Sequence, residues 1–279
     1  MNNTFSFNRF KNLLLNDGKM YLRNFGTTLI VLCCLNAIFW IFNLLFGSAT
    51  DSAVRFGMLC VWTALAMMFA PERVYGKVNL SRDGVRFAMM PTSSLEKFVS
   101  MFIYCAIVTP IVAFFGSYLI DTLLSLFPFG GFEKPIHLYT LNELVRMAND
   151  TDGVVQLGEM SASINDVFPI GMIRTSLYVG IIQWAAIFML GNMLFKKHKA
   201  GKTFACYLGI SYLISTIIGG IMFANPDRID QWFQSLKNLS DVEMIHLWQN
   251  AMTWSLVFSI IVTIVLLFFT YRKIKTQKY

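Results

Sequence analysis

The chain has 279 residues, of which 56% are hydrophobic and only 14% are charged, and its net charge is +7. Soluble domains usually carry about 25% charged residues, so this composition excludes an ordinary soluble domain. The basic residues stand beside long apolar runs, a pattern that favours contact with membrane lipid over binding to nucleic acid. We therefore expect an all-α, polytopic membrane protein.

The first 26 residues are expected to form an amphipathic helix on the cytoplasmic interface, because apolar and basic residues alternate there. Several apolar side chains of this segment can share one helical face: Phe7, Phe10, Leu13, Leu14 and Met20. A disordered tail is the alternative interpretation.

Six apolar segments are long enough to cross a bilayer, since a spanning helix needs about 20 apolar residues. They are residues 27–46, 52–70, 98–120, 175–195, 203–223 and 252–271. The second segment is short and carries Arg55 near one end, where a long arginine stem can follow the apolar surface to the interface. The first segment is longer than a signal-peptide core of about 7–15 residues, so we expect it to stay in the mature protein. Residues 1–279 then form a single transmembrane domain.

The distribution of Lys and Arg predicts the orientation of the chain. Seventeen of the 23 basic residues lie in the N-terminal segment, the loops after the second and fourth spans, and the tail. Four lie in the remaining loops, and Arg55 and Arg174 stand at span ends. Because cytoplasmic loops carry the excess of Lys and Arg, both termini are expected in the cytoplasm. The loops 121–174 and 224–251 are then external.

Polar and small residues inside the spans have two interpretations. Uncharged polar side chains can line a substrate path, although they more often form hydrogen bonds between helices; here they are Asn36, Asn43, Gln183 and Asn192. Small residues near four-residue spacing let two helix backbones approach closely; in the fifth span they are Ala205, Gly209, Ser215 and Gly219. That contact can lie within the chain or with a second copy. Pro110, in the third span, predicts a kink that serves as a hinge or as a fixed bend.

Several classes of enzyme site have no counterpart in the sequence. The five cysteines all lie in apolar runs, with no CxxC spacing and no neighbouring histidine. Disulfide and metal sites are therefore not expected. The interiors of the predicted spans contain no Asp, Glu, Lys or Arg, and the chain has no Walker A sequence, nucleophile elbow or metal-ligand helix motif. We expect a protein that is not an enzyme and that binds no cofactor.

The loop between the second and third spans is the most distinctive cytoplasmic feature. Ser93 and Glu96 have the spacing of a capping box, which predicts that a helix starts there. The simplest interpretation is that this segment begins the third span and that its basic residues set topology. That interpretation does not explain why some 27 residues join two helices that a short turn could connect.

The segment Pro91–Phe98 reads Pro-Thr-Ser-Ser-Leu-Glu-Lys-Phe. It resembles the Pro-Ala-Ser-x-x-Glu-Lys-Phe segment of permease subunits of type-two ATP-binding-cassette exporters, with Thr92 in place of the usual alanine. The opening Phe5–Phe10 is similar to openings in that family. So is the architecture of an interfacial helix, six spans, cytoplasmic termini and a long loop after the second span. The motif covers about ten residues, whereas the topology covers the whole chain.

The resemblance implies a permease subunit of an ATP-driven transporter, of exporter type, in a bacterial cell inner membrane. It implies a separate cytoplasmic ATPase subunit and a second permease chain, identical or related, as partners. The ATPase subunit is expected to dock on the 72–97 loop, at Arg82, Arg86, Pro91, Ser93, Glu96 and Lys97. The alternative function is that of a non-transporting membrane anchor or sensor, which acts through its external loops.

Overall fold

The computed structural model describes residues 5–46, 52–79, 84, 85, 87, 89–126, 154–157, 160–163, 169–224, 231, 234 and 239–276. Within these ranges, six helices are long and apolar enough to cross a membrane. They include residues Phe7–Asn43, Val54–Val78, Ser94–Ser125, Gly171–Leu194, Lys199–Gly220 and Glu243–Thr276. The expected six long apolar helices are therefore confirmed within the described residues, and they are consistent with a multi-pass membrane protein.

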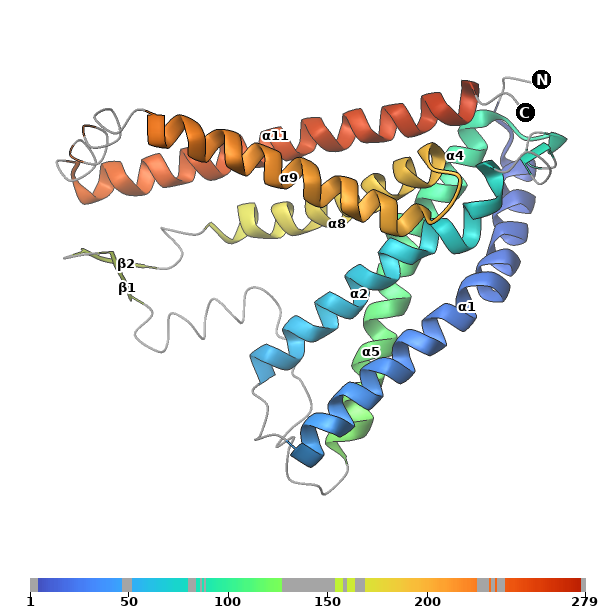
Figure 1. The fold of residues 1–279 in the computed structure, drawn as a ribbon, viewed down its shortest axis with the longest axis horizontal. Helices are drawn as coiled ribbons and strands as arrows, with labels where there is room; N and C mark the ends of the chain where they lie inside the picture. The colour runs from blue at the N-terminus through green and yellow to red at the C-terminus, as the bar shows by residue number, and fades with distance from the viewer. Residues whose placement is uncertain are drawn as a thin grey trace. The chain divides into compact units, whose positions relative to one another are not determined.

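The chain forms two compact units. The first comprises Met1–His137, Ile181–Thr203 and Ile264–Tyr279, and the second comprises Leu138–Gly180 and Phe204–Thr263. In the first unit, helices α1 (Phe7–Phe46), α2 (Ser52–Tyr75) and α5 (Thr109–Ser125) lie side by side (Figure 1). Their buried side chains form one apolar core, which includes Phe25, Ala70, Met101 and Met189.

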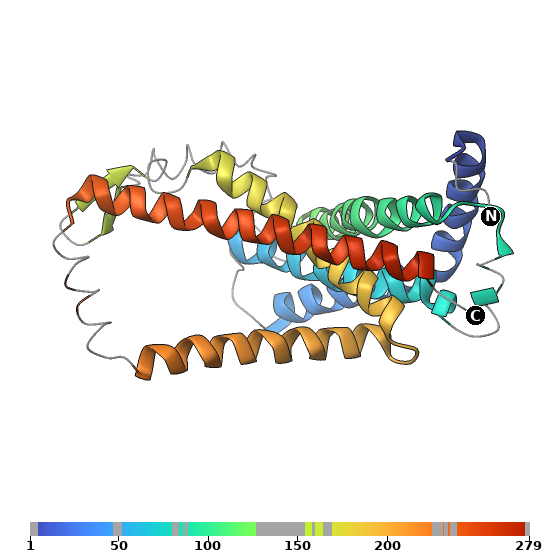
Figure 2. The ribbon, with the colours of Figure 1, turned by 90° about the horizontal axis from the view of Figure 1, so that it is seen from above.

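Helix α1 is continuous from the expected interfacial segment into the first span. Figure 2 shows its first turns at a steep angle to the rest of the helix. The buried side chains of these turns recur every four residues, at Leu13, Asp17, Tyr21 and Phe25. One face of the segment therefore packs against the protein, because residues four apart share a helical face. Whether the segment lies in the membrane interface stays a prediction.

The third span contains a change of helix type before Pro110. Helix α4 (Ser94–Phe102) continues into a π-helical segment, η2 (Ile103–Val108), and then into α5. The backbone N–H of Thr109 donates to the carbonyl of Tyr104, and the Thr109 hydroxyl donates to the same carbonyl at 2.7 Å. A proline ring clashes with the carbonyl four residues earlier in a regular α-helix. The wider turn gives that ring room, so the predicted kink takes the form of a π-helical turn.

The end of α2 and parts of two later helices complete the first unit. A short 3-10 helix, η1 (Gly76–Asn79), follows α2. Helix α8 (Ile170–Leu194) contributes Trp184, whose indole N–H donates to the Ala64 carbonyl of α2 at 3.1 Å. Helix α11 (Asp241–Thr276) contributes Tyr271, whose ring lies edge-on to Phe98 of α4. The start of α1 and the end of α11 lie at the same end of this unit in both views (Figures 1 and 2).

The second unit contains the first turns of α8, most of α9 (Lys199–Ala224) and the first part of α11, up to Thr263. The Thr253 hydroxyl of α11 lies 3.7 Å from the Met172 sulfur of α8. A hairpin of β1 (Val154–Leu157) and β2 (Met160–Ser163) pairs antiparallel. This short hairpin is an addition to the otherwise helical fold. The predicted external loop 224–251 overlaps the start of α11, which begins at Asp241, next to Ser240 and Glu243.

Candidate functional site

Three helix starts and one helix end meet in the first unit. The start of α1 and the start of α4 are bonded to each other, and so are the end of α2 and the start of α9. We call this region, formed by residues 5–24, 69–79, 87–104 and 195–203, the capped end. Apart from residues 84 and 85, it contains the described part of the loop for which the sequence predicts a docking role.

The capping box at the start of α4 is confirmed. The Ser93 hydroxyl oxygen accepts from the backbone N–H of Glu96 at 3.2 Å, and the Glu96 carboxylate accepts from the backbone N–H of Ser93 at 2.9 Å. Both bonds satisfy N–H groups that a helix start leaves without a partner inside the helix.

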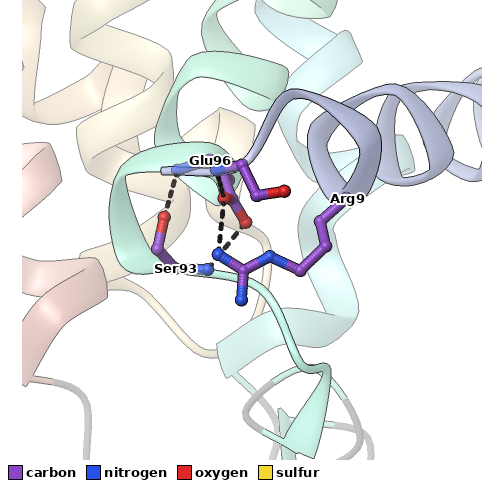
Figure 3. A network of polar contacts seen from close by, with 4 residues as sticks. Arg9, Ser93 and Glu96 are labelled. Atoms are coloured by element: carbon purple, nitrogen blue, oxygen red, sulfur yellow. Dashed lines mark hydrogen bonds and ion pairs between the residues drawn. The ribbon is translucent and has the colours of Figure 1, made fainter. Parts of the chain in front are cut away.

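The same carboxylate also holds the start of α1. Its second oxygen accepts from the backbone N–H of Ser6 at 2.8 Å and lies 3.3 Å from Nη2 of Arg9. Figure 3 shows Arg9 reaching the carboxylate beside Ser93. The Glu96 side chain is 0% exposed. A buried negative charge at two helix N-termini and beside a guanidinium is stabilised by both dipoles and by the ion pair.

Lys97 fixes the preceding loop against α4. Its ammonium donates to the carbonyl of Phe87 at 2.6 Å and lies 4.8 Å from the centre of the Phe87 ring. The side chain is buried, with its charge satisfied by this carbonyl and ring. Lys97 therefore holds Phe87 of the preceding loop against the start of α4.

A second carboxylate joins α2 to α9. The two oxygens of Glu72 accept from the backbone N–H groups of Lys199 at 3.3 Å and of Ala200 at 2.8 Å. The Lys199 ammonium donates in turn to the carbonyl of Gly76. His198, with φ of 50°, makes the left-handed turn that brings α9 to this position. Glu72 thus caps a helix that begins 127 residues later in the chain.

Asp17 is a functional candidate that the sequence analysis misses. One of its carboxylate oxygens accepts from the Ser100 hydroxyl of α4 at 2.6 Å and from the Tyr75 hydroxyl of α2 at 3.0 Å. Asp17 is buried, so this carboxylate joins three helices inside the protein. Its place four residues after Leu13, on the buried face of α1, is the signal that could have identified it.

The predicted docking residues fall into three groups. Arg82 and Arg86 lie outside the described residues. Ser93, Glu96 and Lys97 are buried and hold helices together. Pro91 is exposed, and so are its apolar neighbours Met89, at 78%, and Leu95, at 45%. The docking role stays a prediction, and the exposed side chains of this segment are the ones that a partner can reach.

Two of the four polar span residues lack the hydrogen bonds between helices that their type most often makes. Asn36 and Asn192 are 0% and 1% exposed, and within the described part of the chain neither side-chain amide has a hydrogen-bond partner. Asn43 donates to the carbonyl of Phe39 in its own helix at 2.9 Å. Gln183 is half-buried on α8. A buried amide without a partner costs about 1 to 3 kcal/mol, so these two asparagines reduce the stability of the fold unless another group binds them.

Arg55 is buried instead of reaching the interface. Its guanidinium donates to both carboxylate oxygens of Asp121, with 2.9 Å between Nε and Oδ1. The pair joins the start of α2 to the end of α5, and both side chains are almost fully buried. The sequence analysis assigns Asp121 to the external loop, one residue beyond the third span, and therefore misses this partner.

Within their own unit and its described residues, the small residues of α9 make no close helix contact, so the expected contact stays a prediction. Ala205, Gly209 and Ser215 are exposed and Gly219 is half-buried. A Cβ atom added to either glycine would meet nothing within 4 Å in the described structure. Contact with a second copy stays a prediction. The close approach lies instead at Gly191 of α8, where an added Cβ would overlap the side chain of Thr203.

The capped end thus links α1, α2, α4 and α9 through the buried carboxylates of Asp17 and Glu96 and the half-buried carboxylate of Glu72. These bonds can transmit a displacement of the 72–97 loop to several spans at once. Comparison with known proteins gives no family: no family model, no curated protein and no solved structure matches this chain.

Proposed function

We propose that this chain is the membrane-spanning permease subunit of an ATP-driven transporter of exporter type, in a bacterial inner membrane. A separate cytoplasmic ATPase subunit drives it through the 72–97 loop. The observation that carries the proposal is the double role of Glu96, which binds the starts of α1 and α4 inside the segment that resembles the permease motif.

The bonds of the loop support a mechanical coupling. Near its start, Glu72 holds α9, and near its end, Glu96 and Lys97 hold α1, α4 and the loop itself. Charge-assisted hydrogen bonds inside the protein are short and strong, so the groups that they join move together. A force on the exposed side chains Met89, Pro91 and Leu95, or on Arg82 and Arg86, then changes the tilt of α1, α4 and α9.

The buried amides support a substrate path. Asn36 of α1 and Asn192 of α8 have no hydrogen-bond partner within the described residues. We infer that they bind polar groups of a passing substrate, with Gln183 as a further donor or acceptor. The small residues on the exposed face of α9 suit contact with the second permease chain.

The first experiment is purification from the native membrane in a mild detergent, followed by mass spectrometry of the intact complex. We expect two copies of this chain with two copies of a soluble subunit that carries a Walker A sequence. A monomer or a homo-oligomer that never binds an ATPase would contradict the proposal. That result would favour the anchor or sensor function instead.

Charge reversal in the loop tests the coupling. We expect Glu96→Lys and Arg86→Glu to leave membrane insertion intact and to uncouple ATP hydrolysis from transport in reconstituted vesicles. Loss of insertion would show that the loop mainly sets topology. Lys275→Glu, at the end of α11 and outside the loop, is the control for the charge change.

A further inference from the structure

A basic cleft lies at the capped end. Its volume is about 810 Å³, and its walls come from the end of α2, the turn between α8 and α9, and Asn24 of α1. The cationic side chains that line it come from both of the first two walls: Arg73, Lys77, Lys196, Lys197 and Lys199. Such a concentration of one sign of charge in a concave surface attracts anions.

The acidic group that lines this cleft does not neutralise its positive charges. Among the residues that line it, the acidic one is Glu72, whose two oxygens already accept from the N–H groups of α9. Lys199 is buried and bonded to the carbonyl of Gly76, whereas Arg73, Lys77, Lys196 and Lys197 are exposed. The exposed cations give the cleft a net positive potential.

The position of the cleft at the ends of two apolar runs identifies the kind of anion. Phe69, in its lining, is next to the end of the second apolar run at residue 70, and Lys196 directly follows the fourth run. The cationic side chains therefore stand where the hydrocarbon region ends and lipid headgroups begin.

A second cavity adjoins the first. It has a volume of about 400 Å³ and shares Asn24 and Lys77 with the cleft, and its lining adds Lys19 and Arg23 together with the carboxylate of Asp17. The cations of this lining outnumber its acidic group, so the positive surface is larger than one phosphate ion needs, which favours a headgroup attached to a lipid.

We propose that the cleft formed by Arg73, Lys77, Lys196 and Lys197 binds the phosphate of an anionic phospholipid headgroup. The bound lipid bridges the end of α2 and the turn before α9, and it reduces the repulsion among these cations. This site does not depend on the proposed transport function, and a sensor or an anchor could contain it equally well.

The test uses the full chain, freed of lipid in a mild detergent and titrated with short-chain phosphatidylglycerol. The thermal-unfolding temperature reports binding, because a ligand that binds only the folded state stabilises it by an amount that grows with the logarithm of ligand concentration over Kd. Short-chain phosphatidylcholine and inorganic phosphate are the comparison ligands. We expect phosphatidylglycerol to raise the unfolding temperature at concentrations where the other two have no effect.

Two variants with equal loss of charge decide whether the cleft is the site. Each lysine near an anionic headgroup contributes about fivefold in affinity, so Lys77→Gln/Lys196→Gln/Lys197→Gln should weaken phosphatidylglycerol binding by roughly 100-fold. Arg272→Gln/Lys273→Gln/Lys275→Gln removes the same charge from the end of α11, outside both cavities, and should change binding less than about twofold. If the cleft variant unfolds without lipid, Lys197→Gln alone should still weaken binding about fivefold.

Three results would overturn the proposal. Equal losses in both triple variants would show that net charge, and not the cleft, binds the lipid. Equal binding of phosphatidylcholine would exclude recognition of an anion. Full stabilisation by inorganic phosphate at the same concentration would identify a site for the free ion and not for a lipid.

Discussion

At the scale of single residues, Glu96 joins two helices that are far apart in sequence. We expect Glu96→Gln to reduce the free energy of unfolding by about 2 kcal/mol. A glutamine amide has one acceptor oxygen instead of two, so some of the N–H groups that Glu96 binds lose their partner. Thermal unfolding of the purified chain in detergent measures the change.

The matched control is Glu243→Gln at the start of α11. Glu243 accepts from the N–H and the hydroxyl of Ser240, at 2.9 and 2.8 Å, but it is exposed. Water can replace its bonds, so the unfolding temperature should fall less than in Glu96→Gln. Equal changes in the two variants would contradict the role assigned to burial and to the second helix.

The buried pair of Arg55 and Asp121 gives a prediction for a double-mutant cycle. Asp121→Leu alone should destabilise the protein by about 3 to 5 kcal/mol, because it leaves a buried guanidinium without its counter-charge. Arg55→Met/Asp121→Leu removes both charges and should recover most of that loss. Unfolding curves for the two single variants and the double variant give the coupling energy, and additive effects would show that the pair is not coupled.

The sequence predicts local partners better than distant ones. The spacing of Ser93 and Glu96 is enough to predict the capping box, since both residues lie in one turn. The bonds from Glu96 to Ser6 and Arg9 join residues 90 and 87 positions apart. No spacing rule covers such pairs, because tertiary packing alone brings them together. Asp121 is missed for the same reason, and so are the partners of Asp17 on α2 and α4.

At the scale of helices, hydropathy finds the spans but not their ends. The last span is predicted at 252–271, whereas α11 runs from Asp241 to Thr276. A spanning helix continues into polar residues beyond the hydrocarbon region, so the apolar run marks only its middle. The π-helical segment in the third span also has no hydropathy signal, because it changes the hydrogen bonds and not the residue types.

Two glycines on neighbouring helices should respond differently to substitution. Gly191→Ala should reduce the stability of the folded chain by about 1 to 3 kcal/mol, because its Cβ would overlap Thr203. Gly209→Leu should leave the stability of the single chain nearly unchanged, since the space around Gly209 is open in the described structure.

Unfolding curves and the mass of the intact protein separate these effects. If α9 binds a second copy, Gly209→Leu will reduce the dimer population without lowering the unfolding temperature of the monomer. A loss of monomer stability in Gly209→Leu equal to that in Gly191→Ala would contradict this assignment.

At the scale of the whole molecule, the six apolar helices of the described residues predict that both ends lie on one side of the membrane, and the basic loops predict that this side is the cytoplasm. Single cysteines test the prediction in right-side-out vesicles. We expect Ser240→Cys to react with a membrane-impermeant maleimide in intact vesicles, and Lys197→Cys to react only after permeabilisation. Both parent residues are exposed.

The parent chain is the control for these labels, because its own cysteines all lie in apolar runs. Labelling of Lys197→Cys in intact vesicles would show that the orientation of the chain is opposite to the predicted one. It would also exclude the 72–97 loop as the docking site of a cytoplasmic ATPase, since the two segments are bonded through Glu72 and Lys199.

The double capping by Glu96 has a consequence for synthesis of the chain. The ribosome makes Ser6 about 90 residues before it makes Glu96. At about 5 to 20 residues per second, the start of α1 waits roughly 5 to 18 s for its carboxylate. During that interval the first span is already in the membrane while its N-terminal turn still lacks its final partner. Biogenesis of the first helix is therefore completed only when the third helix arrives.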